Sequence, residues 1–181
     1  MKETIEIERK WLIKQMPDIA AHQPEETHEI TQSYLPVSGL RLRQKDDTYL
    51  ITLKSSGRIA RSEWEESLPK WAYQELIGQA VGSLRKTRYV FHDGEQLLEV
   101  DVYHDNLEGL ITVEAESIVE LEASLSTIER QEQIKAAEAS AEAYALPSWI
   151  SDAIDVTEDK TYSNHSLATK GLPTKLTRAP F

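Results

Sequence analysis

Polar and apolar residues alternate along much of the first two thirds of the chain. In residues 3–13, Ile5 and Ile7 fall on one side of an extended chain, and Glu6 and Glu8 fall on the other. A period of two is typical of a β-strand. The same pattern recurs and predicts eight strands, at residues 3–13, 27–35, 39–46, 48–55, 61–68, 84–92, 96–104 and 110–118.

Helices are predicted after the fifth and eighth of these strands. The first begins at Pro69, which suits the start of a helix, and the second spans roughly residues 124–144, where Ala and Glu dominate. Shorter helical turns are expected within residues 14–22 and 148–168. We therefore predict one domain over residues 1–168 and a flexible C-terminal tail over residues 169–181.

The polar side of the predicted strands is mostly charged, and the sign of the charge depends on the strand. Acids dominate the first, seventh and eighth strands, whereas cations dominate the third, fourth and sixth. The side chains on this face are Glu6, Glu8, Lys10, Arg41, Arg43, Thr52, Lys54, Arg61, Glu63, Glu65, Lys86, Arg88, Glu99, Asp101, Glu114 and Glu116. One interpretation is a β-sandwich that exposes this face to water. A solvated face would, however, more often mix both signs along each strand.

The predicted helices favour a different arrangement, because they need an apolar surface to pack on and only the other strand face supplies one. The charged face then turns inward if the sheet closes, as about eight strands can. We predict an α+β fold: a closed eight-stranded antiparallel β-barrel with helices packed outside.

Composition narrows the classes of ligand. The net charge of −11 argues against a nucleic-acid or anionic-membrane surface, since both need a basic footprint. The absence of cysteine excludes disulfides and thiolate chemistry. No apolar run approaches the ~20 residues of a membrane span, and the N-terminus does not resemble a signal peptide. A cytoplasmic protein without membrane or nucleic-acid partners is expected, and a homodimer is left open.

A barrel lined by both signs of charge needs water, metal and a charged ligand, because unpaired buried charge is very costly. Carboxylates bind hard cations such as Mg²⁺, and Arg and Lys bind phosphate oxygens. A polyphosphate–metal complex satisfies both groups together. The sequence contains neither a GxxxxGK nor a GxGxxG motif, so it does not support a P-loop or Rossmann mode of phosphate binding.

Several motifs in the same order resemble the CYTH superfamily, the triphosphate tunnel metalloenzymes. Residues 6–10 match its ExExK signature, and the strand Arg41-Leu42-Arg43 follows in order. The further matches are Gln32-Ser33-Tyr34-Leu35, Thr52-Leu53-Lys54, Arg61-Ser62-Glu63-Trp64-Glu65, Lys86-Thr87-Arg88, Glu114-Ala115-Glu116 and Lys160-Thr161-Tyr162-Ser163-Asn164. The likeness covers residues 3–168, and the size is similar to that of the short bacterial members.

The resemblance implies roles for these residues. Metal ions, Mg²⁺ or Mn²⁺, would be held by carboxylates, and the phosphates would be gripped by cations. Lys10, between the two sets, would orient the phosphate or the attacking water, so it is grouped with Glu6 and Glu8 as catalytic. The expected metal ligands are Glu6, Glu8, Glu63, Asp101, Glu114 and Glu116. The expected substrate-binding residues are Arg41, Arg43, Lys54, Arg61, Lys86 and Arg88, with Tyr34 and Lys160 at one mouth.

The resemblance also implies an activity, namely metal-dependent hydrolysis of a small-molecule triphosphate, with inorganic tripolyphosphate expected first. The alternatives within the superfamily are a nucleoside or thiamine triphosphatase and a class IV-type adenylyl cyclase. A non-catalytic polyphosphate-binding module is the alternative outside enzymes. The cluster of carboxylates weighs against that module, because a pure phosphate binder gains nothing from it.

Overall fold

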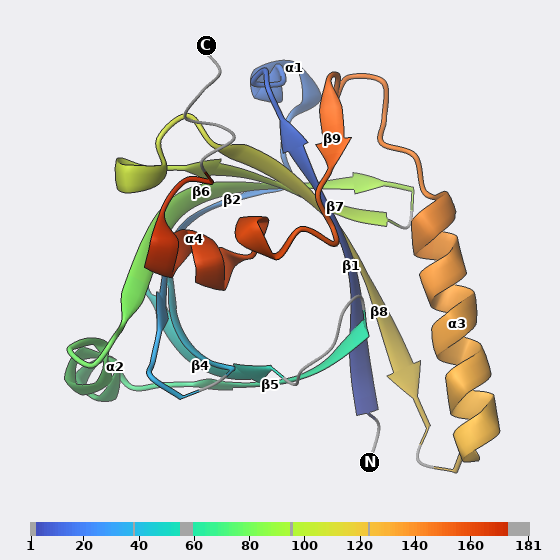
Figure 1. Ribbon diagram of the computed structural model, residues 1–181, viewed down its shortest axis with the longest axis horizontal. Coiled ribbons are helices and arrows are strands. Elements are labelled where there is room, and N and C mark those ends of the chain that lie inside the picture. Colours follow the sequence, from blue (N-terminus) through green and yellow to red (C-terminus); the bar gives the residue numbers. More distant parts are fainter. Residues whose placement is uncertain (1–2, 38, 55–59, 95, 123, 174–181) are drawn as a thin grey trace.

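The computed structural model describes residues 3–37, 39–54, 60–94, 96–122 and 124–173, and its centre is one antiparallel sheet of nine strands (Figure 1). All eight predicted strands are present, with ends shifted by a few residues. The strands are β1 (Glu3–Ile13), β2 (Glu26–Tyr34), β3 (Leu40–Lys45), β4 (Thr48–Lys54), β5 (Ala60–Ser67), β6 (Gly82–Asp93), β7 (Gln96–Tyr103), β8 (Ile111–Leu121) and β9 (Ala153–Asp155). The ninth strand, β9, was not predicted, because three residues are too few to show alternation.

The order of the strands is β5-β4-β3-β2-β6-β7-β8-β1-β9, and β5 also pairs with β1. β1 pairs with β8 along most of its length. Its other edge is shared, since residues 5–7 pair with β5 and residues 11–13 pair with β9. The strands therefore curve around a central space, and the two sides of the sheet meet at β1 (Figure 1). The predicted antiparallel α+β class is confirmed, with nine strands in the sheet instead of eight.

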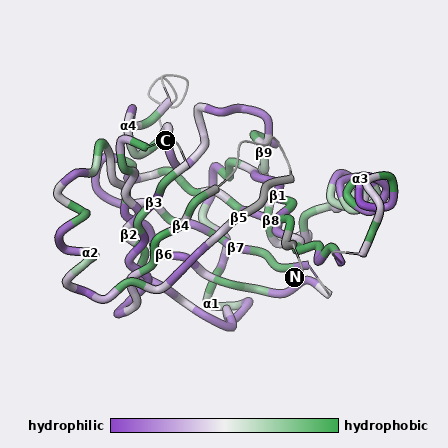
Figure 2. The backbone as a smooth tube through the Cα atoms, turned by 90° about the horizontal axis from the view of Figure 1, so that it is seen from below, coloured by the Kyte–Doolittle hydropathy of each residue, from purple (hydrophilic) through white to green (hydrophobic). Residues whose placement is uncertain are grey.

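The longer helices cover the outer, apolar face of the sheet. α2 and α3 lie at opposite sides of the molecule, and α3 runs beside β1 and β8 (Figure 2). The helices are α1 (Ile19–His22), α2 (Lys70–Ile77), α3 (Thr127–Ala143) and α4 (Asn164–Lys170), with 3₁₀ turns η1 (Asp105–Leu107) and η2 (Lys160–Tyr162). A capping box of Ser126 and Glu129 starts α3, which packs Ala141 against Ile5 and Ile7. Among the helices in the described ranges, none has both the length and the apolar composition needed to cross a membrane.

The prediction that the helices pack outside is wrong for the C-terminal segment, because η2 and α4 lie on the concave side of the sheet (Figure 1). Leu12 shares the inward side of β1 with the charged residues, and Leu84 does the same on β6. These two leucines, with Tyr103, form an apolar cluster that Tyr162 and Leu167 cover. The inward face is thus charged along only part of its length, and its apolar end is buried by the C-terminal segment.

The predicted tail also needs a correction at its start. Residues 169 and 170 belong to α4, so the helix runs past the predicted boundary at residue 168. Residues 174–181 lie outside the described part of the chain.

Candidate active site

A cavity of about 230 Å³ lies inside the curved sheet, and nearly all of its lining is charged or polar. Four cations and six carboxylates face it, and Ile30 is the one apolar residue among the described lining residues. The lining consists of Glu6, Glu8, Ile30, Gln32, Arg41, Arg43, Glu65, Lys86, Arg88, Glu99, Glu114, Glu116 and Asn164. The predicted inward charged face is therefore present.

Strand register explains how acids from distant parts of the sequence meet. Glu8 of β1 lies directly opposite Glu116 of β8, and Glu114 of β8 lies opposite Glu99 of β7. Residues directly opposite each other in an antiparallel pair place their side chains on the same face, about 5 Å apart. The carboxylates consequently gather at one side of the cavity.

Within this carboxylate cluster, Glu116 and Glu99 are the acids whose ionised forms are disfavoured. Burial raises the pKa of Glu116 to about 8, and the nearby carboxylates of Glu99, Glu6 and Glu8 contribute to the same rise. Burial likewise raises the pKa of Glu99. A divalent cation would relieve this repulsion, and oxygen ligands are those that Mg²⁺ and Mn²⁺ prefer. Within the described ranges, no three such groups already converge as a formed metal site. The donor set nevertheless fits a hard cation in its chemistry.

The cations of β6 are held by acids from β7 and β8. Arg88 donates two hydrogen bonds of 2.7 Å to the two carboxylate oxygens of Asp101, and it reaches Glu114 Oε2 at 2.7 Å. Lys86 Nζ also bonds Asp101. Burial and the positive charge of Arg88 lower the pKa of Lys86 to about 8, in spite of this partner. Asp101, predicted as a metal ligand, does not line the cavity and instead holds Lys86 and Arg88 in place.

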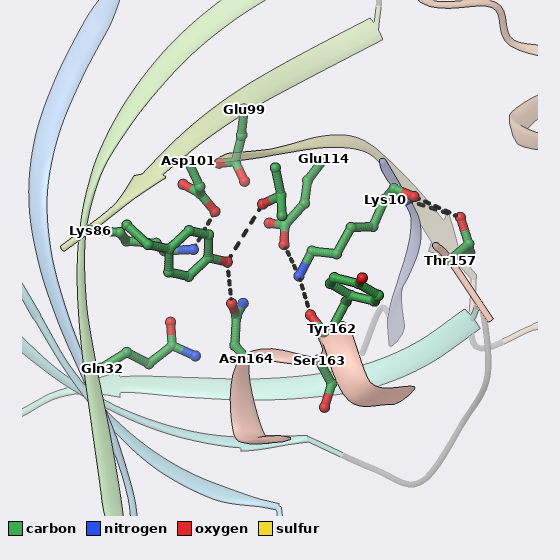
Figure 3. A network of polar contacts seen from close by, with 12 residues as sticks. Lys10, Gln32, Lys86, Glu99, Asp101, Glu114, Thr157, Tyr162, Ser163 and Asn164 are labelled. Carbon is green, nitrogen blue, oxygen red and sulfur yellow. Dashed lines mark hydrogen bonds and ion pairs between the residues drawn. The ribbon is translucent and has the colours of Figure 1, made fainter. Parts of the chain in front are cut away.

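Lys10 lies beside the cavity, where its ammonium is buried against Glu114. The Nζ atom lies 2.6 Å from Glu114 Oε1 and donates to the carbonyl oxygen of Tyr162 at 3.2 Å (Figure 3). Burial alone would lower the pKa of Lys10, but the carboxylates of Glu114 and Glu8 outweigh it and raise the pKa. The contact places Lys10 beside the acids of the site, and its predicted role in orienting the phosphate or the attacking water stays a prediction.

On the opposite wall, Arg41 and Arg43 share an acid. Their guanidinium groups lie 3.6 and 3.7 Å from Glu65 Oε2, which also accepts a 2.7 Å hydrogen bond from Thr52. Glu65 was assigned no role from the sequence, although alternation placed it on the same face as Glu63. It keeps the two arginines directed into the cavity.

The other residues predicted for the site either do not line the cavity or have side chains outside the described part of the structure. Tyr34 packs edge-on against His165 of α4 at 5.0 Å between ring centroids, and Lys160 is exposed at the start of η2. Neither is among the residues that line the cavity. The side chains of Lys54, Arg61 and Glu63 lie outside the described part of the structure.

Sequence reasoning gave no role to Glu99, Gln32 and Asn164, which also face the cavity. Alternation carried the signal for Glu99, since it lies two residues before Asp101. Gln32 and Asn164 belong to motifs that carry the family resemblance. Nothing local in the sequence, however, indicates that Asn164 reaches the inside of the sheet.

A larger cavity of about 520 Å³ lies between α4, β6 and η1. It contains none of the predicted site residues. Arg85 at its rim is already bound by both oxygens of Asp105, at 3.1 and 3.2 Å. The smaller cavity, where acids and cations converge, is therefore the candidate active site.

The order and geometry of these residues agree with a known family. A family model described as the CYTH domain matches residues 4–145. The chain belongs to the CYTH domain family. All lining residues of the polar cavity except Asn164 fall inside the match.

Known proteins with similar sequence or structure point to the same family. An inorganic triphosphatase of Nitrosomonas europaea is 35% identical over 170 residues, which cover 90% of this chain and 96% of that protein. The crystal structure of the inorganic triphosphatase NE1496 has a TM-score of 0.59 at 32% identity, and the match covers 93% of this chain and 96% of that one. A conserved hypothetical protein from Pyrococcus furiosus, at 19% identity and a TM-score of 0.52, covers 75% of this chain and 88% of its own. This last likeness shows the fold alone.

Proposed function

We propose that this CYTH chain is a metal-dependent triphosphatase that hydrolyses inorganic tripolyphosphate in the polar cavity. The observation that carries the proposal is the lining of that cavity, in which four cations face the same small volume as six carboxylates. The 35% identity to an inorganic triphosphatase supports the same activity. We further propose that β1 to β8 act as a closed barrel, in which the pairing of β5 with β1 completes the wall.

The acids would bind the metal ions, and the cations would bind the phosphates. Glu6, Glu8, Glu114 and Glu116 would hold Mg²⁺ or Mn²⁺, together with Glu63. Arg41, Arg43, Lys86 and Arg88 would bind the phosphate oxygens, with help from Lys54 and Arg61. Asp101 would keep Lys86 and Arg88 oriented, which differs from its earlier expected role as a ligand.

Charge accounts for most of the expected rate enhancement. The bound metal would offset phosphate charge and lower the pKa of an attacking water. The arginines would hold the phosphate chain in line for displacement, with no covalent nucleophile from the protein. Lys10, fixed by Glu114, would direct its remaining proton donors toward the reacting phosphoryl group or the attacking water.

The lining of the cavity favours an inorganic substrate over a nucleotide. No aromatic side chain occurs among its described lining residues, so a base or a thiazolium ring has no stacking partner there. Its volume of about 230 Å³ is also below the ~300–1,000 Å³ of pockets for organic ligands. The nucleoside triphosphatase, thiamine triphosphatase and adenylyl cyclase activities therefore rank behind tripolyphosphate hydrolysis.

Phosphate release from tripolyphosphate, ATP and thiamine triphosphate, each with Mg²⁺ and with Mn²⁺, tests the proposal. Tripolyphosphate should give the highest kcat/KM, and EDTA should abolish turnover. Faster hydrolysis of ATP, or cyclic AMP formation, would establish a nucleotide enzyme instead. Tight tripolyphosphate binding without turnover of any substrate would establish a binding module.

Glu8→Gln should reduce kcat by roughly a hundredfold or more, because it removes one negative ligand while keeping the side-chain shape. Turnover should recover partly at high Mn²⁺ concentration. Glu132→Gln, an equal change at an exposed position of α3, is the control and should behave like the wild type. Near-normal activity of Glu8→Gln would refute the metal assignment.

A further inference from the structure

Asn164 reaches the active-site cavity from a part of the chain that the family match leaves out. It is the first residue of α4, and the CYTH match ends at residue 145. Every other described lining residue of the polar cavity comes from the sheet strands. The side chain therefore enters the site from α4, the helix that lies on the concave side of the sheet (Figure 1) and covers its apolar end.

Tyr103 fixes the orientation of the Asn164 amide. Its hydroxyl donates a 2.7 Å hydrogen bond to Asn164 Oδ1. The same phenol oxygen accepts a hydrogen bond of 3.5 Å from the Thr112 hydroxyl. Burial raises the pKa of Tyr103, so the phenol stays protonated and keeps donating. Because the amide oxygen is engaged in this way, the Nδ2 group must turn its two N–H donors elsewhere. Asn164 Nδ2 donates to no other described residue.

The amide is not needed to start the helix. Ser163 is the N-cap of α4, and its hydroxyl accepts the hydrogen bond from the Ser166 backbone N–H at 3.2 Å. Asn is a poor helix former in comparison with Ala at this position. Ser163 therefore caps the helix, and Asn164 Oδ1 accepts the hydrogen bond of the buried Tyr103 hydroxyl, but neither contact uses the N–H donors of Asn164.

The segment that carries Asn164 is anchored to the catalytic strand β1. The Lys10 backbone N–H donates to Thr157 Oγ1 at 3.0 Å, and the Lys10 ammonium donates to the Tyr162 carbonyl (Figure 3). Asn164 follows Tyr162 by two residues, so its position is tied to that of Lys10. A donor held in this way is preorganised for a ligand and loses little entropy on binding.

We propose that the Asn164 amide donates a hydrogen bond to a phosphoryl oxygen of the bound triphosphate and that Tyr103 is the residue that positions it. This inference rests on the proposed function, because it names a further contact to the same substrate. A neutral donor at this wall complements the cations: it binds a phosphoryl oxygen without adding to the repulsion around Lys86 and Arg88.

The test compares Asn164→Asp and Asn164→Ala with the wild type. Asn164→Asp keeps the size and the acceptor for Tyr103 but replaces the N–H donors with a negative charge. It should raise the KM for tripolyphosphate at least tenfold, whereas Asn164→Ala should raise it three- to tenfold. Asn106→Asp is the matched control, since Asn106 is exposed in η1 and outside the polar cavity, and its KM should match that of the wild type.

Tyr103→Phe tests the positioning role. It should raise KM severalfold in the wild type but have little further effect in Asn164→Ala, because the oriented amide is then absent. Thermal unfolding of each variant, measured in parallel, separates loss of the donor from loss of folding. Additive effects of the two changes would overturn the role of Tyr103.

Binding of tripolyphosphate with Mg²⁺, measured by calorimetry, keeps this inference apart from the proposed function. If the wild type binds but does not hydrolyse tripolyphosphate, the proposed function fails, while a tenfold weaker Kd of Asn164→Asp still supports the contact. If Asn164→Asp and Asn106→Asp both bind tripolyphosphate with a Kd within twofold of the wild type, the contact does not exist.

Discussion

At the scale of single residues, the candidate site is defined by buried charges that have been given partners. Lys86 and Asp101 are 1% and 0% exposed, and they bind each other. Removing one member of such a pair leaves an uncompensated buried charge, which typically costs several kcal/mol. Glu116 differs, because the groups that face it include four other carboxylates. Its environment favours the protonated acid.

This environment predicts how stability depends on pH in the metal-free protein. The pKa of Glu116 rises from its ordinary 4.5 to about 8 on folding, so the folded state binds the proton more tightly. The resulting stabilisation is fully present below about pH 4.5 and is lost as pH rises through about 8. In EDTA, Glu116→Gln should therefore have a higher Tm than the wild type at pH 8 and a smaller difference at pH 5. Thermal unfolding across this range is the measurement.

Glu132→Gln, on the exposed face of α3, is the control for this change and should keep the pH dependence of the wild type. Adding Mg²⁺ at pH 8 should raise the Tm of the wild type more than that of Glu116→Gln. Identical pH profiles for all three proteins would show that Glu116 is not under repulsion from its neighbours.

At the scale of elements, the C-terminal segment completes both the core and the site. Leu167 of α4 covers the apolar end of the concave face, and Asn164 of the same helix lines the polar cavity. The helix approaches β6 closely at Gly82, where a Cβ atom would lie 2.5 Å from the carbonyl oxygen of Ala168. Glycine at this position therefore permits the close packing of α4 on the strand.

Gly82→Ala should push α4 away from β6, because the nearest atoms belong to backbone and cannot move aside as a side chain would. We expect a loss of about 1–3 kcal/mol in unfolding free energy, as for other overpacked sites. KM for tripolyphosphate should also rise, since Asn164 moves with the helix. Thermal unfolding and steady-state kinetics measure the two effects.

Gly78→Ala is the matched control, because an added Cβ at Gly78 meets nothing within 4 Å. This variant should unfold at or slightly above the wild-type temperature and have wild-type kinetics. Equal behaviour of the two alanine variants would mean that the approach of α4 to β6 does not govern the site.

At the scale of the whole molecule, this curved sheet differs from most in the distribution of its polar residues. A curved sheet usually has an apolar interior, whereas much of this interior is charged. Part of the core lies between the outer face of the sheet and the helices, as where Ile7 packs on α3. The concave side holds the charged residues beside a second apolar cluster, which Tyr162 and Leu167 cover. A net charge of −11 coexists with a local group of cations, because those cations are held inward by neighbouring acids. We therefore expect a ligand of mixed charge to stabilise this interior.

Tripolyphosphate and Mg²⁺ together should therefore raise the Tm more than either does alone. At a ligand concentration of one hundred times Kd, the gain in unfolding free energy is about 2.7 kcal/mol, or roughly 5–10 °C for a chain of this size. Differential scanning fluorimetry of the wild type, with tripolyphosphate in large excess so that it persists through the scan, measures the effect. Arg43→Ala should reduce the shift, and Lys135→Ala, on the exposed surface of α3, should not. An additive response to the two ligands would contradict the joint binding of metal and phosphate.

Local sequence determined the strands and the side to which each residue points. A period of two fixes the face of a side chain as soon as a segment is extended, so Glu6, Glu8, Arg41 and Arg43 could be assigned to one surface in advance. The strand order was not available in this way. No local pattern indicates that β2 lies beside β6, or that β1 meets both β8 and β5.

The tertiary structure alone decided which charges meet and what closes the concave side. Asp101 pairs with Lys86 and Arg88 because β6 and β7 are neighbours, and this contact changes its expected role. Asn164 enters the cavity because α4 covers an apolar end of the inward face, which is a requirement of packing between distant segments. Periodicity is a property of a few consecutive residues, whereas partners in a sheet depend on how the whole chain folds back. The charged surface could therefore be predicted from the sequence. Which of its residues bind one another, and which are left to bind metal or phosphate, could not.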